Sequence, residues 1–470
     1  MERHPSQSNP LVPRADRYAA GRAMRRVVSR HSHADWQATA GRADPIAILE
    51  AQGRRRIAEL LPIRYGRMRA SPLAFLRGAA AIMAADLATT PATGLVVQSC
   101  GDCHLLNFGS YATPEGLPVF DINDFDETLP APFEWDLKRL SASLVLAGRG
   151  HGLAARACRR LAADAVLAYA SEIGRLAGLT PLEAWSTRID LLDAIDSIGD
   201  RQARRHARLS LEQQLQSAAV QYGLLDTTGT TPRLIEKPPL VMRLPGRETE
   251  VRKAFARYAG TLSPERRLLL ERYRLEDVIF KVVGIGSVGT FCAIGLFSTA
   301  DGEPLLLQIK EAQASVLEPF AGPSAYGNSG ERVVVGQRVM QAASDLFLGW
   351  THSTGRQDNA EDDAHDHAGE ADAGGRHFYV RRLKDSRLAA LGSAIEQHGL
   401  QDYAALCGQT LGRAHARSGE IVGLSAYIGR GRAFARAIAD FGVSYADQTE
   451  RDFALFGHAV SSGRLPTAPG

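Results

Sequence analysis

A short β-rich unit enclosed between two helical stretches is the feature that most constrains the fold of this chain. From about Glu276, three runs rich in β-branched and apolar residues follow one another, separated by a glycine-rich loop and by the turn 299–303. A helix is expected over 331–344, and two further strands over 347–353 and 377–383. The apolar residues on both sides of this unit recur at helical spacing. We therefore expect an α+β protein with a small antiparallel β lobe and a larger, mostly helical lobe.

Composition excludes several classes of partner. The 55 basic and 52 acidic residues give a net charge of +3, too even a mixture for the one-signed field that non-specific nucleic-acid binding needs. No stretch has the roughly 18 uninterrupted apolar residues of a membrane span, and the N-terminus lacks the apolar core of a secretory signal. The five cysteines are an odd, sparse set that fits a reducing compartment. A cytoplasmic protein without nucleic-acid or membrane partners is expected.

The segment GDCHLLN, residues 101–107, directly follows an expected strand over 95–100. Asp102 and Asn107 have the spacing at which a phosphoryl-transfer loop places the aspartate that accepts the substrate proton and the asparagine that holds a metal ion. Asp124 comes later, behind a second short strand, and carboxylate oxygens are ligands that Mg²⁺ prefers. The alternative is a β-turn that collects Asp and Asn because these residues suit turns.

The same region holds one further catalytic candidate and one further candidate metal ligand. His104 is a second catalytic candidate, and Asp126, after the strand expected over 117–122, is a further metal ligand. His104 also completes the pattern C-x-x-C-H that begins at Cys100. Haem attachment of that kind needs export, and a zinc site needs a second ligand pair that is missing at useful spacing, so both are set aside. The histidines that border the later acidic loop are expected to be solvated: His365, His367 and His377.

A glycine-rich loop, GIGSVG over 284–289, separates the first two of the three β-rich runs. In a dinucleotide-binding fold such a loop opens a helix, whereas residues 290–297 are apolar and have no helical period. A glycine loop between two strands is the arrangement that covers nucleotide phosphates in kinases, and an ordinary glycine-rich hairpin is the alternative. The candidate nucleotide contacts in this loop are Gly284, Gly286, Ser287 and Gly289.

Lys310 lies in the third β-rich run, in a chain where only six of the 55 basic residues are lysines. A lysine in such a run indicates a need for a compact ammonium, as in the pairing of nucleotide phosphates, and a lysine that snorkels from a strand edge is the alternative. A helix-borne acid should brace Lys310. Glu331 is the nearest candidate for this role and for the nucleotide site, and Glu318 is another, although either could be an ordinary acid at a helix N-terminus.

Together these strings resemble the bacterial family called domain of unknown function 2252. The resemblance runs from about Pro45 to about Phe456 and rests on SCGDCHLLNFG, FDINDFDET, PFEWDLKRL, KVVGIGSVGT, LQIKEA, GERVVVGQRVMQAASDLFLGW, FYVRRLKD, RAHARSG and YADQ. It implies a distant similarity to the protein-kinase-like and aminoglycoside-phosphotransferase-like proteins. On that similarity Asp102 matches the catalytic aspartate, Asn107 and Asp124 match the metal ligands, and Asp136 matches the aspartate that braces the catalytic loop.

The order of the motifs differs from that of a kinase, because the glycine loop and Lys310 follow Asp102 and Asp124 instead of preceding them. A circular permutation of a two-lobed kinase-like fold would reconcile the two orders. Residues 282–383 would then form the N-lobe, and helices over 401–418 would precede the catalytic loop in space. The expected segments are a loose N-terminal arm over 1–40, the first, catalytic-loop-bearing part of the helical lobe over 41–275, a β-rich nucleotide-binding lobe over 276–385 with an acidic loop over 355–376, and helices that complete the helical lobe over 386–470.

The resulting expectation is an ATP- and Mg²⁺-dependent phosphotransferase that acts on a hydroxyl-bearing acceptor, either a small molecule or a protein. Three alternatives stay open: a nucleotide-binding regulator without turnover, a nucleotidyl transferase on the same fold, and a scaffold without nucleotide. The departures from the kinase pattern are Cys100, where these families usually have His, and Asp126, where kinases have Gly. Arg64, Arg67 and Arg77 are either anion contacts for the acceptor or arginines of a solvated helix face.

Overall fold

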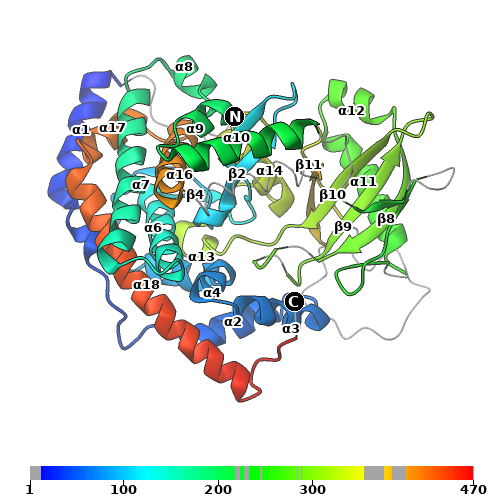
Figure 1. Ribbon diagram of the computed structural model, residues 1–470, viewed down its shortest axis with the longest axis horizontal. Coiled ribbons are helices and arrows are strands. Elements are labelled where there is room, and N and C mark those ends of the chain that lie inside the picture. The colour runs from blue at the N-terminus through cyan, green and yellow to red at the C-terminus, as the bar shows by residue number, and fades with distance from the viewer. Residues whose placement is uncertain are drawn as a thin grey trace.

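The computed structural model describes residues 12–216, 223–226, 232–243, 246–282, 284–286, 288–353, 375–383 and 399–468. Within them the protein is mixed α/β, with small antiparallel sheets and a majority of helix. The largest sheet lies at one side of the molecule and the long helices at the other, with short strands and helices between them (Figure 1).

The main sheet has six strands in the order β11-β12-β10-β9-β8-β7, and all neighbours are antiparallel. The strands are β7 (Val241–Met242), β8 (Arg274–Lys281), β9 (Cys292–Ser298), β10 (Pro304–Glu311), β11 (Gly349–His352) and β12 (His377–Arg382). Five of them, β8 to β12, confirm the runs expected from the sequence. Strand β10 lies between β9 and β12, where Lys310 is paired with Cys292 and Tyr379. Its side chains from Leu305 to Lys310 are buried, so both faces of the strand are covered.

The β-rich unit begins earlier than the expected residue 276. Strand β7 pairs with β8, and helix α11 (Glu248–Tyr258) packs against β8 and β11. Its buried side chains, among them Phe255 and Tyr258, share one apolar cluster with Phe280 and Phe297. The sequence predicts a helix here but not its lobe, because the apolar face of a helix does not indicate which surface it covers.

Helix α14 (Ser329–Met340) is the helix expected over 331–344, and it contacts β11 and β12. Asn328 caps its N-terminus, accepting hydrogen bonds from the amides of Gly330 at 2.7 Å and Glu331 at 3.2 Å. The middle of α14 packs closely against Thr128, because a Cβ added at Gly336 would lie 2.3 Å from Thr128 Cγ2. Helix α14 therefore joins the main sheet to the rest of the molecule.

The helical part is built around α6 (Phe133–Gly150), which is buried over almost its whole length. It packs against α7 (Ala155–Leu176) and α18 (Arg432–Ser461), while α16 (Leu400–Ala416) packs along α7 (Figure 1). The other helices of four residues or more in the described segments are α2 (Pro45–Gly53), α3 (Leu61–Met68), α4 (Pro72–Gly78), α5 (Ala80–Leu87), α8 (Pro181–Ser186), α9 (Leu191–Asp196), α10 (Arg201–Gln216), α12 (Pro264–Leu270), α13 (Glu318–Ala321) and α17 (Ile421–Ile428), besides α1 below. No helix of the described segments is both long and apolar enough to cross a bilayer.

Short two-stranded sheets hold the GDCHLLN segment and the segment around Asp124. The strands expected over 95–100 and 117–122 are β1 (Val96–Ser99) and β3 (Pro118–Ile122). Strand β1 pairs with β4 (Leu129–Pro132), and β3 pairs with β2 (Phe108–Ala112). A further small pair joins β5 (Leu225–Asp226) to β6 (Arg233–Leu234). Because β1 ends at Ser99 and β2 begins at Phe108, the GDCHLLN segment forms the loop between them.

The expected loose arm over 1–40 is wrong from Arg14 onward, because α1 (Arg14–Val27) packs against α17. The contact is close: a Cβ at Gly21 would lie 2.3 Å from the carbonyl oxygen of Gly423. Arg25 also donates to the carbonyl of Tyr427 at 2.9 Å, at the end of α17. Helix α1 is therefore held by the close approach of Gly21 to α17 and by the hydrogen bond from Arg25 to the end of α17. Neither contact produces an apolar period in the sequence.

Candidate functional site

A cavity of about 1390 Å³ lies where the main sheet, the GDCHLLN loop and helices α2 to α5 meet. Eight of the eleven candidate catalytic, metal and nucleotide residues line it: Asp102, His104, Asn107, Asp124, Asp126, Gly284, Gly286 and Lys310. Gly289 and Glu331 are not among the lining residues, and Ser287 lies outside the described residues. The structure thus brings together two motifs that are about 180 residues apart in the chain.

Helix α6 holds the GDCHLLN loop in place through hydrogen bonds with its side chains. Asp136 accepts hydrogen bonds from the amides of Cys100 at 2.7 Å and Gly101 at 3.0 Å, and His415 Nε2 lies 3.1 Å from its Oδ2. Gly101 has a φ of +80°, a conformation that favours glycine, and a Cβ there would lie 2.2 Å from the carbonyl oxygen of Glu127. Asp136 therefore braces the loop, as the family resemblance implied.

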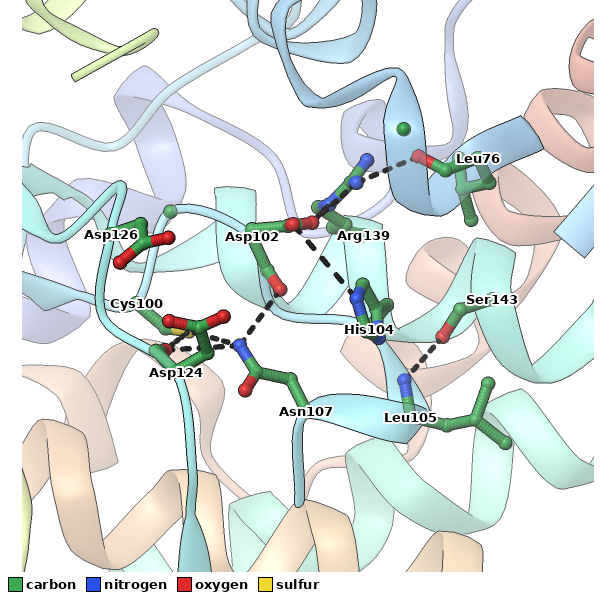
Figure 2. Close-up of polar contacts among 12 residues, drawn as sticks. Leu76, Cys100, Asp102, His104, Leu105, Asn107, Asp124, Asp126, Arg139 and Ser143 are labelled. Carbon is green, nitrogen blue, oxygen red and sulfur yellow. Dashed lines mark hydrogen bonds and ion pairs between the residues drawn. The ribbon is translucent and has the colours of Figure 1, made fainter. Parts of the chain in front are cut away.

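The Asp102 carboxylate is oriented by Arg139, whose Nε donates to Oδ1 at 2.6 Å (Figure 2). Arg139 is buried and also donates to the carbonyl of Leu76 at 2.9 Å. Ser143 accepts from the amide of Leu105 at 3.0 Å. Residues 136, 139 and 143 lie on one face of α6, because positions three and four apart are neighbours on a helix. Arg139 and Ser143 were not predicted from the sequence, although their spacing from Asp136 could have revealed them.

His104 stands next to Asp102 in the cavity wall, with its Nε2 3.9 Å from Asp102 Oδ2. Burial lowers the pKa of His104 to about 3, although the Asp102 carboxylate opposes this shift. The imidazole is therefore neutral at neutral pH. It could donate or accept a hydrogen bond, but it brings no positive charge to the cavity.

Asn107 ties the two acidic segments together. Its Nδ2 donates to the carbonyl oxygens of Asp102 at 3.2 Å and Asp124 at 3.1 Å (Figure 2). The side chain of Asp124 is 44% exposed and faces the cavity. Among the residues described, no group of three or more His, Cys, Asp and Glu side chains could hold a metal ion. An ion here would therefore depend on Asp124 and Asn107 together with ligands from a bound molecule.

Lys310 pairs with the carboxylate of Asp126 and lies 3.7 Å from Oδ1 of Asp124. The Tyr379 hydroxyl donates to the other oxygen of Asp126 at 2.8 Å. Burial would raise the pKa of Asp126, but the Lys310 ammonium holds it well below its usual range, and burial would lower the pKa of Lys310, but the two carboxylates raise it. Both groups are therefore charged, and Asp126 is engaged by Lys310 instead of being open to a metal ion.

The acid that braces Lys310 is accordingly Asp126, and the expected brace by Glu331 is wrong. Glu331 is the first acidic residue of α14, and the side chain that contacts the segment around Asp126 is that of the next residue, the buried Arg332. Arg332 donates to the carbonyls of Thr128 at 2.6 Å and Asp126 at 2.8 Å. Glu318, the other candidate, lines the cavity and lies 3.9 Å from Arg332 Nε. Successive helical residues point about 100° apart, so a shift of one position changes which side chain faces inward.

The glycine loop lies over the GDCHLLN loop. A Cβ added at Gly286 would be 3.9 Å from Asp102 Oδ2 and 3.5 Å from the carbonyl oxygen of Arg77. Arg67 donates to the carbonyl of Gly284 at 2.5 Å, and the Gly289 carbonyl accepts from the amide of Ile57 at 2.8 Å. The loop is thus fastened to α3 and to the segment that precedes it.

Arginines form one wall of the cavity. This wall holds Arg54, Arg55, Arg56, Arg64 and Arg77, while Arg381 lines the cavity from strand β12 of the main sheet. Arg64 is 1% exposed, so the alternative of a solvated helix face is wrong for this residue. Arg54 to Arg56 were missed in the sequence, where a basic triplet in an arginine-rich chain gave no reason to prefer the cavity over the surface.

The two cysteines of C-x-x-C-H lie in or next to the GDCHLLN loop as thiols. Cys100 and Cys103 are free and buried in the same apolar cluster. Burial also raises the pKa of Cys103 well above its ordinary value. Of the bordering histidines, His377 is half-buried at the start of β12 and accepts a hydrogen bond from the amide of Ser329, while His365 and His367 lie outside the described residues.

A family model described as "Uncharacterized protein conserved in bacteria (DUF2252)" matches residues 56–459. This match spans both loops of the cavity and the helices that hold them. No curated protein and no solved structure matches the chain. The cavity itself is therefore the basis for assigning a function.

Proposed function

Because the chain belongs to the DUF2252 family, whose description names no activity, we propose a function from the cavity: transfer of a phosphoryl group from ATP to a hydroxyl-bearing acceptor. The observation that carries the proposal is that Asp102, Asp124 and Lys310 line one cavity beneath the glycine loop. A phosphoryl-transfer site needs these parts, namely a base beside the acceptor, a carboxylate for a metal ion, and a cation with backbone amides for phosphates.

In this proposal, Lys310 and the loop around Gly284 and Gly286 hold the phosphates of the nucleotide. The residues that would hold Mg²⁺ are Asp124 and Asn107, with phosphate oxygens as further ligands. When bound, the ion neutralises charge on the phosphates. Asp102, oriented by Arg139, accepts the hydroxyl proton of the acceptor as the acceptor oxygen bonds to the γ-phosphorus. The bond from that phosphorus to the β,γ-bridging oxygen breaks, and ADP leaves with the electron pair.

A kinase-like fold in circularly permuted order is part of this proposal. Support comes from the run of glycine loop, lysine strand, helix α14 and strands β11 and β12 along the chain. Further support comes from α16, where Tyr403 donates to the carbonyl of Leu105 at 2.9 Å and His415 contacts Asp136 on the buried helix α6. The two proposed lobes are then a β-rich nucleotide-binding lobe and a helical lobe drawn from chain on either side of it.

A second candidate, a nucleotide-binding regulator without turnover, is favoured by one observation. Asp126 stands where kinases have glycine and pairs with Lys310, so a phosphate must compete with a carboxylate for the ammonium. Such a regulator would bind ATP and Mg²⁺ and release no ADP.

Incubation of the purified protein and cell extract with ATP labelled at the γ- or the α-phosphate tests the proposal. Transfer of the γ-label alone is expected, whereas transfer of the α-label indicates nucleotidyl transfer. Asp102→Asn and Asp124→Asn should each lower γ-transfer about 100-fold or more. Asp301→Asn, at an exposed turn, is the matched control and should keep the wild-type rate. Unchanged transfer in the Asp102 and Asp124 variants would overturn the assignment.

A further inference from the structure

The wall of the cavity formed by α2 to α5 carries positive charge without acidic neighbours on the same wall. The lining residues between positions 43 and 85, a segment described throughout, include five arginines and no Asp or Glu. They are Arg54, Arg55, Arg56, Arg64 and Arg77. The acids of the cavity come instead from other elements, and one of them, Asp126, is already paired with Lys310.

Arg64 is the most confined member of this wall. It is 1% exposed, and its Nη2 donates to the carbonyl of Gly78 at 2.7 Å. Its Nε and Nη1 are buried and have no hydrogen-bond partner. Burial, with repulsion from the Arg56 guanidinium, lowers the pKa of Arg64. A buried cation with unmade hydrogen bonds is costly, and an anion in the cavity would remove that cost.

Arg56 connects this wall to the place where transfer would occur. Its Nη1 donates to the carbonyl of Val288 in the glycine loop at 2.6 Å, and its buried Nε has no hydrogen-bond partner. The backbone of Arg77 lies close to Gly286, which also lies close to Asp102. An anion held by the wall would therefore be next to the catalytic aspartate and under the tip of the glycine loop.

We propose that the arginine wall is the acceptor subsite, and that the acceptor carries an anionic group, a phosphate or a carboxylate, besides the hydroxyl it presents to Asp102. This inference rests on the proposed phosphotransferase function. The planar guanidinium presents paired N–H donors that match the oxygens of both anions. A cationic acceptor, such as an aminosugar, would be repelled by the same wall.

Calorimetric titration of inorganic phosphate, and separately of succinate, into the full-length protein saturated with Mg²⁺ and the β,γ-imido analogue of ATP tests the inference. At least one anion should bind to the complex, and the one that binds identifies the anionic group. Arg64→Met should weaken that binding about tenfold or more, while the analogue binds within twofold of wild type. Arg69→Met, at an exposed arginine that ends the same helix, is the matched control and should bind the anion normally.

The outcomes separate the subsite from the nucleotide proposal. If phosphate displaces the analogue, or if neither anion binds, the acceptor inference is overturned while nucleotide binding stands. If the analogue fails to bind but an anion binds in an Arg64-dependent way, the phosphotransferase proposal fails and the anion subsite is supported. Should Arg64→Met not fold, Arg56→Gln replaces it, and anion binding unchanged in that variant would overturn the inference.

Discussion

The ammonium of Lys310 is paired with the carboxylate of Asp126, although 184 positions separate the two residues in the chain. The pair joins the centre of the main sheet to the segment that follows β3. Lys310 is 2% exposed, and the Tyr379 hydroxyl donates to the remaining oxygen of Asp126. Removing one partner of such a buried pair leaves an uncompensated charge, whereas removing both charges does not.

We therefore expect Lys310→Met to lower the free energy of unfolding by about 3–5 kcal/mol. The double variant Lys310→Met/Asp126→Asn should recover much of this loss, because the amide is neutral and still accepts from Tyr379. Urea denaturation of the wild type and both variants measures the difference. Lys253→Met, at an exposed lysine of α11, should change stability by less than about 0.5 kcal/mol. Equal losses in the single and double variants would contradict the pairing.

Arg139 should act on the proposed reaction by positioning Asp102, since its guanidinium holds that carboxylate from the buried helix α6. Arg139→Met is expected to lower the maximal rate of phosphoryl transfer about 10- to 100-fold, with little change in the KM for ATP. Arg139→Lys keeps the positive charge but lacks the paired N–H donors of the guanidinium, so it should recover only part of the rate. Steady-state kinetics separate the two parameters, and a changed KM with an unchanged rate would assign Arg139 to binding instead. Arg156→Met, at an exposed arginine of α7, controls for loss of charge.

Acid sensitivity should come in part from His33, which is fully buried with its Nε2 2.7 Å from the Tyr427 hydroxyl. Burial lowers the pKa of His33 to about 3, against an ordinary value near 6.5 in the unfolded chain. As the pH falls below about 6.5, the unfolded chain takes up a proton that the folded protein does not, so the free energy of unfolding decreases. Between pH 7 and pH 5 this one group should cost about 2 kcal/mol.

The matched pair His33→Gln and His31→Gln isolates that contribution. Urea denaturation at pH 7 and at pH 5 should show a smaller loss of stability in His33→Gln than in the wild type. His31 is exposed, and its variant should retain the full pH dependence. An unchanged pH dependence in His33→Gln would mean that another group is responsible.

Local motifs in the sequence predicted much of the cavity wall. GDCHLLN and GIGSVG each encode a turn geometry within a few residues, and the strands beside them follow from β-branched runs, so both loops and Lys310 could be located. The partner of Lys310 could not, because Asp126 and Glu331 are equally acidic in the sequence and only the tertiary contact distinguishes them. Helix α1 was missed for a similar reason, since Gly21 and Arg25 hold it through contacts with α17 that leave no apolar period. The burial of Arg64 likewise depends on the packing of α3 against α4, which the local sequence around Arg64 does not reveal.

Close packing of α16 on α7 should be sensitive to a single methyl group at Gly408. A Cβ there would lie 1.9 Å from the carbonyl oxygen of Ala165, so the helices must move apart. Gly408→Ala is expected to lower the free energy of unfolding by about 1–3 kcal/mol. Helix α16 also carries Tyr403 and His415, which contact the GDCHLLN loop and its brace, so phosphoryl transfer should fall as well.

Gly457→Ala is the matched control for this change, because Gly457 lies in α18 and a Cβ there would meet nothing within 4 Å. Alanine is the better helix former, so this variant should gain about 0.5–1 kcal/mol. Urea denaturation of the two variants should therefore give shifts of opposite sign. A gain in both would show that α7 and α16 can accommodate the methyl group, and the proposed link between their packing and the GDCHLLN loop would then have to be abandoned.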